Sequence, residues 1–328
     1  MAIKDEIQGP NGYLKKVREE TMPNTKEMAD LALEKYQGEI GKILVKDDVM
    51  GCADEILREL FIAETEIFSE KNSEIMQNVL PYYYDNIYEK KDEKYAETSI
   101  QIKRLLEIYN MCKNETITTD VFIKEISDIT VPIIDTVSFS QKQSAKCRVG
   151  ETLQNHLSKI FDICEIPYET QQQRVEGGTI MDFIIPSSDD INKAPDQVIN
   201  IECQTTLKDR FRLTTGKSTD GKVKRYLATI TGAGIVTARD TKDLTAGKVK
   251  EIIQDNNVTL VVLESVKANI KSMLEETKLK YEDKKTTVGK DGLTVDDINR
   301  LIELSDKKIV SFNELITKDI KSIMVYWQ

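Results

Sequence analysis

The sequence predicts a mixed α/β fold in which a central β-sheet is flanked by helices and preceded by a helical amino-terminal region. Apolar residues recur every three or four positions over residues 24–129, which is typical of amphipathic helices. Beyond that region, short β-rich runs alternate with helical ones, which indicates a mixed sheet with helices on its faces. The chain has 328 residues, enough for one large domain or two.

The amino-terminal helices begin with a capping signal. Asn24 precedes Glu27 by three residues, the spacing of a capping box. The tyrosines of PYYYDNIYEKKDEKY fall at helical spacing, so we expect them to pack in a core. The pattern changes near Thr130. We therefore predict a helical region, residues 1–130, that either dimerises or embraces a ligand, and a core, residues 131–328.

The core is predicted to open with one amphipathic helix, SQKQSAKCRVGETLQNHLSKIFDICEIPYE. One side of this helix carries Leu153, Leu157, Ile160 and Phe161. Strands are predicted in TIMDFIIP, QVINIECQTT, KVKRYLATITGAGIVTARD and VTLVVLES, with a helix in LTAGKVKEIIQDN between the last two. A helix opened by Thr294 follows, and SIMVYWQ is expected to close the chain as a strand.

The charge of the chain is negative overall but uneven. A net charge of −10 argues against a protein that coats nucleic acid indiscriminately. Between Gln204 and Arg225, however, seven basic residues stand against two acidic ones. This segment is either a local contact for a polyanion or a solvated charged surface.

Several classes of site and compartment are disfavoured by the composition. The chain has no apolar run of membrane-spanning length and no signal-peptide core at its start. None of its five cysteines has CxxC spacing, so neither a zinc site nor a disulfide framework is expected. The sequence is instead consistent with a protein of the reducing cytoplasm. A single histidine and the absence of a GxxxxGK[ST] loop disfavour a Ser/His triad and a nucleotide cofactor.

Two carboxylates interrupt neighbouring apolar strands. Asp182 lies in TIMDFIIP and Glu202 in VINIECQTT, and a turn-rich loop joins the two runs. Buried carboxylates are costly unless they are paired or bind a cation, and a hard divalent ion relieves their repulsion. Taken singly, each is more often a surface residue at a strand end. Converging at one edge of the sheet, they predict a site for Mg²⁺.

Further polar residues accompany these carboxylates. Glu151, on the preceding helix, is expected to point at the same cluster. Gln204 shares a strand face with Glu202, where its amide can orient a water or a phosphate but supplies no positive charge. Lys208 is a candidate for that charge, unless the chain turns after Thr206 and takes it elsewhere.

This order of residues resembles the PD-(D/E)XK nuclease superfamily, with Gln204 at the lysine position as an ExQ variant. The string TTLKDRFR is similar to the segment after the catalytic strand in the EcoRII, SsoII and PspGI group of type II restriction endonucleases, which read sites containing CC and GG. SAKCRVGE resembles the helix that carries an accessory glutamate, which maps to Glu151. The resemblance covers about residues 144–212 and implies a restriction-endonuclease-like core.

The resemblance implies that Lys208, Asp209 and Arg210 contact C·G pairs. Physical chemistry agrees, because arginine forks onto guanine and a carboxylate accepts from cytosine. Some members of the group carry their second acidic ligand at the place of Lys217, so here Glu202 keeps that role. Phosphate contacts, which position DNA without reading it, are predicted for the remaining basic residues: Arg212, Lys217, Lys222, Lys224 and Arg225.

We therefore expect a type II restriction endonuclease that uses Mg²⁺ to hydrolyse both strands of double-stranded DNA at a palindromic site with a CC/GG core. Asp182 and Glu202 would hold the metal, with Gln204 and Glu151 assisting. A homodimer would match the palindrome, one active site to each strand. Two alternatives stay open: a nuclease of the same core acting on repair intermediates, junctions or modified DNA, and a sequence-specific binding module without catalysis.

Overall fold

The computed structural model describes residues 3–9, 11–91, 93–173, 180–207, 222–235, 243–283 and 292–328. Its contacts divide the chain into two units. Unit 1 comprises Met1–Leu31 and Glu64–Arg148, and unit 2 comprises Ala32–Ala63 and Val149–Gln328. The two longest helices, α4 (Lys46–Tyr83) and α6 (Thr119–Ile163), contribute residues to both units. The division at residue 130 stays a prediction.

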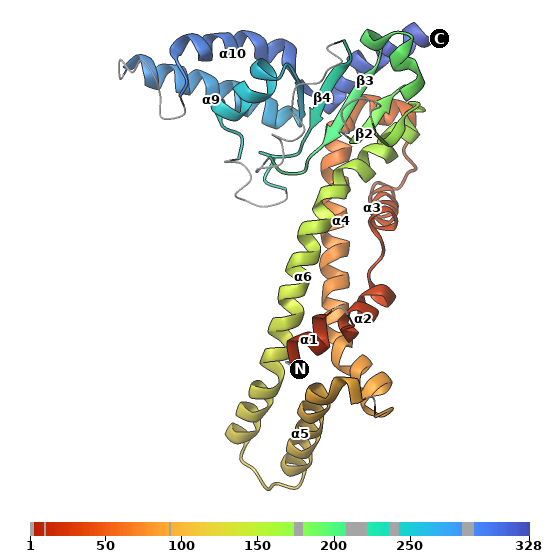
Figure 1. Ribbon diagram of the computed structural model, residues 1–328, viewed down its shortest axis with the longest axis vertical. Coiled ribbons are helices and arrows are strands. Elements are labelled where there is room, and N and C mark those ends of the chain that lie inside the picture. Colours follow the sequence, from red (N-terminus) through yellow and green to blue (C-terminus); the bar gives the residue numbers. More distant parts are fainter. Residues whose placement is uncertain are drawn as a thin grey trace. The chain divides into compact units, whose positions relative to one another are not determined.

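Unit 1 is helical, as the apolar periodicity predicts. Besides parts of α4 and α6 it contains α1 (Ile3–Gln8), α2 (Tyr13–Thr21), the beginning of α3 (Thr25–Ile40), the π-helical turn η1 (Tyr84–Tyr88), the 3-10 turn η2 (Glu93–Tyr95) and α5 (Ala96–Lys113). In Figure 1, α5 and the first part of α6 run alongside each other as a helical hairpin. An ion pair between Arg104 and Glu125 links these two helices.

Tyrosine rings form the centre of the unit 1 core. Tyr13, Tyr83 and Tyr95 are all buried, and the ring centroid of Tyr13 lies 5.0 Å from that of Tyr83 and 5.8 Å from that of Tyr95. Packing of Tyr83 and Tyr95 is as expected from the sequence, whereas Tyr84 of the same run is 37% exposed, so the expectation was wrong for that residue. The capping box of α3 is also confirmed, since Asn24 Oδ1 accepts the backbone N–H of Glu27 at 3.0 Å while Glu27 Oε2 accepts that of Asn24 at 2.9 Å.

Unit 2 is built on a mixed six-stranded sheet, which confirms the predicted fold class. Its strands are β1 (Glu169–Gln173), β2 (Ile180–Ile185), β3 (Ile199–Cys203), β4 (Lys224–Ala228), β5 (Thr259–Val262) and β6 (Ile309–Ser311), in that spatial order. The pairs β1–β2 and β2–β3 are antiparallel, and the three pairs from β3 to β6 are parallel.

Helices cover this sheet. After β4 come α8 (Ala246–Lys250), the π-helical turn η6 (Glu251–Asp255), α9 (Glu264–Asp283) and α10 (Val295–Lys308), while the short 3-10 turns η3 (Ser188–Asn192) and η4 (Pro195–Gln197) lie between β2 and β3. Figure 1 shows α9 and α10 packed side by side next to the sheet. Thr294 opens α10 as predicted, through a capping box with Asp297.

The carboxyl-terminal segment is helical, so the predicted closing strand in SIMVYWQ is wrong. After β6 the chain enters α11 (Phe312–Glu314), the π-helical turn η7 (Leu315–Ile320) and α12 (Lys321–Trp327). A capping box between Ser311 and Glu314 starts this helical run.

The end of α6 packs its apolar side into the core of unit 2. Leu153, Leu157, Ile160 and Phe161 are each 0% exposed, which confirms the predicted face. The ring of Phe161 lies 5.1 Å from that of Phe183 on β2. No helix within the described residues is long and apolar enough to span a membrane.

Candidate active site

The two predicted carboxylates lie on adjacent strands. β2 and β3 pair in antiparallel fashion with Ile184 opposite Asn200 and Phe183 opposite Ile201. Asp182 and Glu202 are the next residues along these two strands. Phe183 and Ile201, which lie opposite each other in this pair, both belong to the large hydrophobic core.

The Asp182 carboxylate lies at the end of β3. Its Oδ2 accepts the backbone N–H of Cys203 at 2.7 Å. Burial raises the pKa of Asp182, and this hydrogen bond offsets part of that rise. The pKa of the Cys203 thiol is raised first by its own burial and then by the negative charges of Asp182 and Glu202. The charges of both carboxylates therefore reach the Cys203 thiol at the end of β3.

The chain leaving β3 is held firmly. Gln204 continues the pairing with β4, because its backbone N–H donates to the carbonyl of Ala228 at 2.9 Å. Three residues later, the N–H of Leu207 donates to Thr231 Oγ1 at 3.0 Å, and that hydroxyl also lies 3.3 Å from the carbonyl oxygen of Thr205. These buried contacts fix the backbone directly ahead of position 208.

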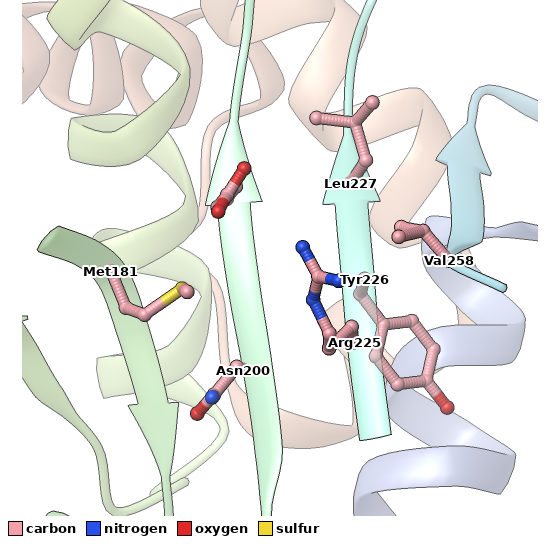
Figure 2. A pocket seen from close by; sticks show the side chains of 7 residues that line it. Met181, Asn200, Arg225, Tyr226, Leu227 and Val258 are labelled. Carbon is pink, nitrogen blue, oxygen red and sulfur yellow. The ribbon is translucent and has the colours of Figure 1, made fainter. Parts of the chain in front are cut away.

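Beside Glu202 a small hollow opens between β2, β3 and β4. Glu202, which is only 6% exposed, contributes to its wall. Figure 2 shows Asn200 on β3 facing into the hollow, with Met181 on one side and Arg225 on the other. The hollow measures about 10 Å³, room for one water molecule. Asn200 is 1% exposed, and neither its Oδ1 nor its Nδ2 has a hydrogen-bond partner among the described residues.

Of the other predicted site residues, one is exposed on α6 and several lie outside the described residues. Glu151 is exposed on α6. Within the described ranges no three His, Cys, Asp or Glu side chains are grouped so that they could hold a metal ion, so a role for Glu151 beside the two carboxylates stays a prediction. The predicted base-reading triplet and two phosphate contacts lie outside the described residues: Lys208, Asp209, Arg210, Arg212 and Lys217.

The three remaining basic residues differ in their surroundings. Lys222 and Lys224 are exposed near the start of β4. Arg225 is half-buried and lines the same hollow as Glu202. Solvent access suits the first two to contacts with a polyanion, whereas Arg225 lies half-buried on β4 in the hollow that Glu202 also lines.

The chemistry of the donor set fits a hard divalent cation. Asp182 and Glu202 supply carboxylate oxygens, and Mg²⁺ is usually bound by one or two carboxylates together with waters and substrate oxygens. The raised pKa of Asp182 indicates that burial disfavours the negative charge of its carboxylate. A cation at this point would compensate it.

Comparison with known proteins agrees with this geometry. A sequence model described as "EcoRII C terminal" matches residues 110–284, more than half of the chain. The chain belongs to the EcoRII C terminal family. The region matched in this family member contains β1 to β5 and both carboxylates. A search of the curated proteins finds no match.

Solved structures show that this EcoRII C terminal family member has a restriction-endonuclease-like fold. The structure titled "Restriction endonuclease PspGI-substrate DNA complex" superimposes with a TM-score of 0.57 at 14% identity, over 94% of this chain and 96% of that one. "Metal-depleted Ecl18kI in complex with uncleaved DNA" gives 0.60 at 13% identity, over 96% and 83%. The same enzyme with uncleaved, modified DNA gives 0.56 at 16%, over 90% and 83%.

Asn200 is the site residue that sequence reasoning missed. The signal was present, because Asn200, Glu202 and Gln204 are alternate positions of an otherwise apolar strand and so share one face. Glu202 and Gln204 were predicted as site residues from this face, whereas Asn200, two positions before Glu202, was not.

Proposed function

We propose that this family member is a type II restriction endonuclease that hydrolyses both strands of double-stranded DNA, with Mg²⁺, at a palindromic site containing a CC/GG core. The observation that carries the proposal is that Asp182 and Glu202 lie on two paired strands, with the Asp182 carboxylate bound to the Cys203 N–H directly after Glu202. Family membership and the likeness to restriction endonucleases crystallised with DNA support the same activity.

The residues of the chain would divide the work as follows. Asp182 and Glu202 would hold Mg²⁺, which when bound lowers the pKa of a water molecule and offsets charge on the phosphate. The Cys203 N–H fixes the Asp182 carboxylate at 2.7 Å. Gln204 would orient the attacking water or a phosphate oxygen through its side-chain amide, and Glu151 would support the cluster from α6.

Base reading is assigned to Lys208, Asp209 and Arg210. The anchored backbone from Thr205 to Leu207 supports this assignment, because it leads from the catalytic strand directly into the reading segment. A rigid connection of this kind couples recognition to the placement of the scissile phosphate. Phosphate contacts that position the duplex are assigned to the remaining basic residues: Arg212, Lys217, Lys222, Lys224 and Arg225.

A homodimer is part of the proposal, because a palindrome presents two identical half-sites. Exposed large apolar side chains on α5 and the first part of α6 support it: Ile100 and Tyr109 are 57% and 59% exposed, and Ile123 is 58% exposed. Surfaces of this kind usually mark an interaction site. Sedimentation velocity would show a dimer for the wild-type chain and a monomer for Ile123→Glu.

Digestion of a long sequenced DNA with Mg²⁺, followed by mapping of the ends, tests the proposal. Discrete ends within sites that contain CC and GG are expected, and none should appear in EDTA. Cleavage restricted to modified or branched DNA would favour the related nuclease instead. The neutral Gln204 favours a second candidate, a binding module without catalysis, which site-specific binding without cleavage at any divalent ion would identify.

A further inference from the structure

The residue directly before the proposed reading triplet is held from two sides. Leu207, which is 0% exposed, donates its backbone N–H to Thr231 Oγ1 at 3.0 Å. Its carbonyl oxygen accepts a hydrogen bond from Lys248 Nζ at 2.8 Å. The sequence gave no sign of a role for Lys248, which stands 41 residues further along the chain. Side chains from two other segments of unit 2 therefore hold both backbone polar groups of Leu207.

The carbonyl that Lys248 holds determines how the chain continues. It belongs to the peptide unit that joins Leu207 to the next residue, and a peptide unit is planar. Fixing this oxygen together with the N–H of the same residue therefore fixes the plane in which the backbone leaves Leu207. A hydrogen bond from a charged donor is roughly twice as strong as one from a neutral donor, so a lysine is well suited to hold this carbonyl.

The helix that carries Lys248 is itself anchored. Thr245 caps α8, because its Oγ1 accepts the backbone N–H of Lys248 at 3.4 Å. Two residues after Lys248, the Lys250 ammonium lies 3.4 Å from Asp297 Oδ1 on α10. Lys248 thus reaches Leu207 from a helix that is tied to a second helix.

Thr231 is supported from the opposite side. The hydroxyl of Thr229 donates to Thr231 Oγ1 at 2.9 Å, and both residues are 0% exposed. The backbone N–H of Thr229 donates to the carbonyl of Val261 on β5, also at 2.9 Å. The Leu207 N–H is therefore linked through two buried threonines to the parallel part of the sheet.

We propose that Lys248 is a positioning residue for base recognition, because by holding the Leu207 carbonyl it sets the direction in which the reading segment leaves the sheet. The inference rests on the proposed function, which assigns base reading to the triplet that follows Leu207. Reading a base pair needs donors and acceptors placed accurately against the base edges, and supporting residues must hold such groups to within about 0.5 Å. Loss of the Lys248 contact should therefore weaken binding to the recognised site more than binding to other DNA.

A lysine can also act on DNA as a phosphate contact, and the two roles give different results. Loss of a phosphate contact weakens binding to all sequences equally and reduces the slope of log affinity against log salt concentration by about 0.9. Loss of a positioning residue lowers the ratio of the affinities for the recognised and the altered site. It leaves the salt slope unchanged, because no phosphate contact has been removed.

Binding without cleavage measures this ratio. One duplex carries the site mapped from the cleavage ends, and in a second set one G·C pair of that site is replaced by A·T. Affinities for both are measured over a range of salt concentrations, with Ca²⁺ in place of Mg²⁺. Lys248→Met should lower the ratio about tenfold, within the range that one base contact contributes, at an unchanged salt slope.

Lys250→Met is the matched control on the same helix. It removes the ion pair with Asp297 but no contact with Leu207, so it should keep the wild-type ratio. Three results would overturn the proposal: an unchanged ratio in Lys248→Met, an equal loss in both variants, or an equal weakening of all duplexes with a reduced salt slope.

A second measurement needs no DNA. Hydrogen exchange of the Leu207 backbone N–H, followed by mass spectrometry, should become about tenfold faster in Lys248→Met and stay at the wild-type rate in Lys250→Met. If the wild-type protein cleaves no DNA, the proposed function fails, while this exchange rate still decides whether Lys248 holds the chain at Leu207. An unchanged rate in Lys248→Met would overturn that placement.

Discussion

Replacing Asp182 by asparagine separates the active site from the fold. In the structure, Asp182 Oδ2 accepts the Cys203 N–H at 2.7 Å, and an asparagine oxygen can accept the same bond. A hydrogen bond to a charged acceptor contributes about 1.5–3 kcal/mol and one to a neutral acceptor about 0.5–1.5 kcal/mol. Burial nevertheless raises the pKa of Asp182, so the folded chain disfavours its charge, and removing that charge offsets the weaker bond.

We therefore expect the free energy of unfolding of Asp182→Asn, measured without metal at neutral pH, to stay within about 1 kcal/mol of the wild type. Asp182→Ala leaves the Cys203 N–H without this acceptor and should cost about 1–3 kcal/mol. The melting temperature of Asp182→Ala should fall by about 2–4 °C for each kcal/mol.

The rate of DNA cleavage should not follow the order of the two stabilities, because Asp182→Asn and Asp182→Ala should both lose activity. Both variants remove the charge of the proposed metal ligand, and loss of about 4 kcal/mol of metal-assisted stabilisation corresponds to roughly a thousandfold in rate. Single-turnover cleavage of a DNA carrying the mapped site, alongside thermal denaturation, measures both quantities. The reasoning is refuted if Asp182→Asn cleaves at more than a tenth of the wild-type rate, or if it is as unstable as Asp182→Ala.

Three further predictions concern the scaffold. Burial alone would raise the pKa of Glu314, but Lys267, Lys318 and the Ser311 N–H lower it to about 2. The lowered pKa stabilises the folded chain above pH 4.5, the unfolded value, and this stabilisation is lost as the pH falls from there towards 2. Glu314→Gln should therefore cost about 1–2 kcal/mol at pH 7, after allowance for solvent screening, and little at pH 2. Thermal melts at the two pH values measure the difference. Phe183→Ala, at a position 0% exposed, should cost about 3–5 kcal/mol in urea unfolding, and a cost below 1 kcal/mol would contradict its place in the core. Thr231→Val keeps its shape but leaves the Leu207 N–H without its acceptor, so it should lower stability by about 1–3 kcal/mol, whereas an unchanged melting temperature would show that water replaces that hydroxyl.

Local patterns in the sequence determined much of this fold. Thr294 with Asp297 and Asn24 with Glu27 form capping boxes because each needs only contacts within one helical turn. The apolar face of α6 could likewise be read from a spacing of three and four residues. Strands β1 and β6 could not be recognised, since β1 has the polar sequence ETQQQ and β6 has only three residues.

By itself, the sequence determined the order of the elements that carry the candidate site, because Asp182 and Glu202 stand in apolar strands that must be buried. Only the tertiary structure decided which residues from other strands lie next to these carboxylates. Strand pairing sets Arg225 beside Asn200 and Glu202 in one hollow, although more than twenty residues separate them along the chain. Sequence spacing fixes which face of a strand a residue occupies, but the register between strands depends on how the whole sheet assembles. Glu151 is exposed on α6, and its predicted place beside the two strands stays a prediction, because the sequence does not fix how the helix faces the sheet.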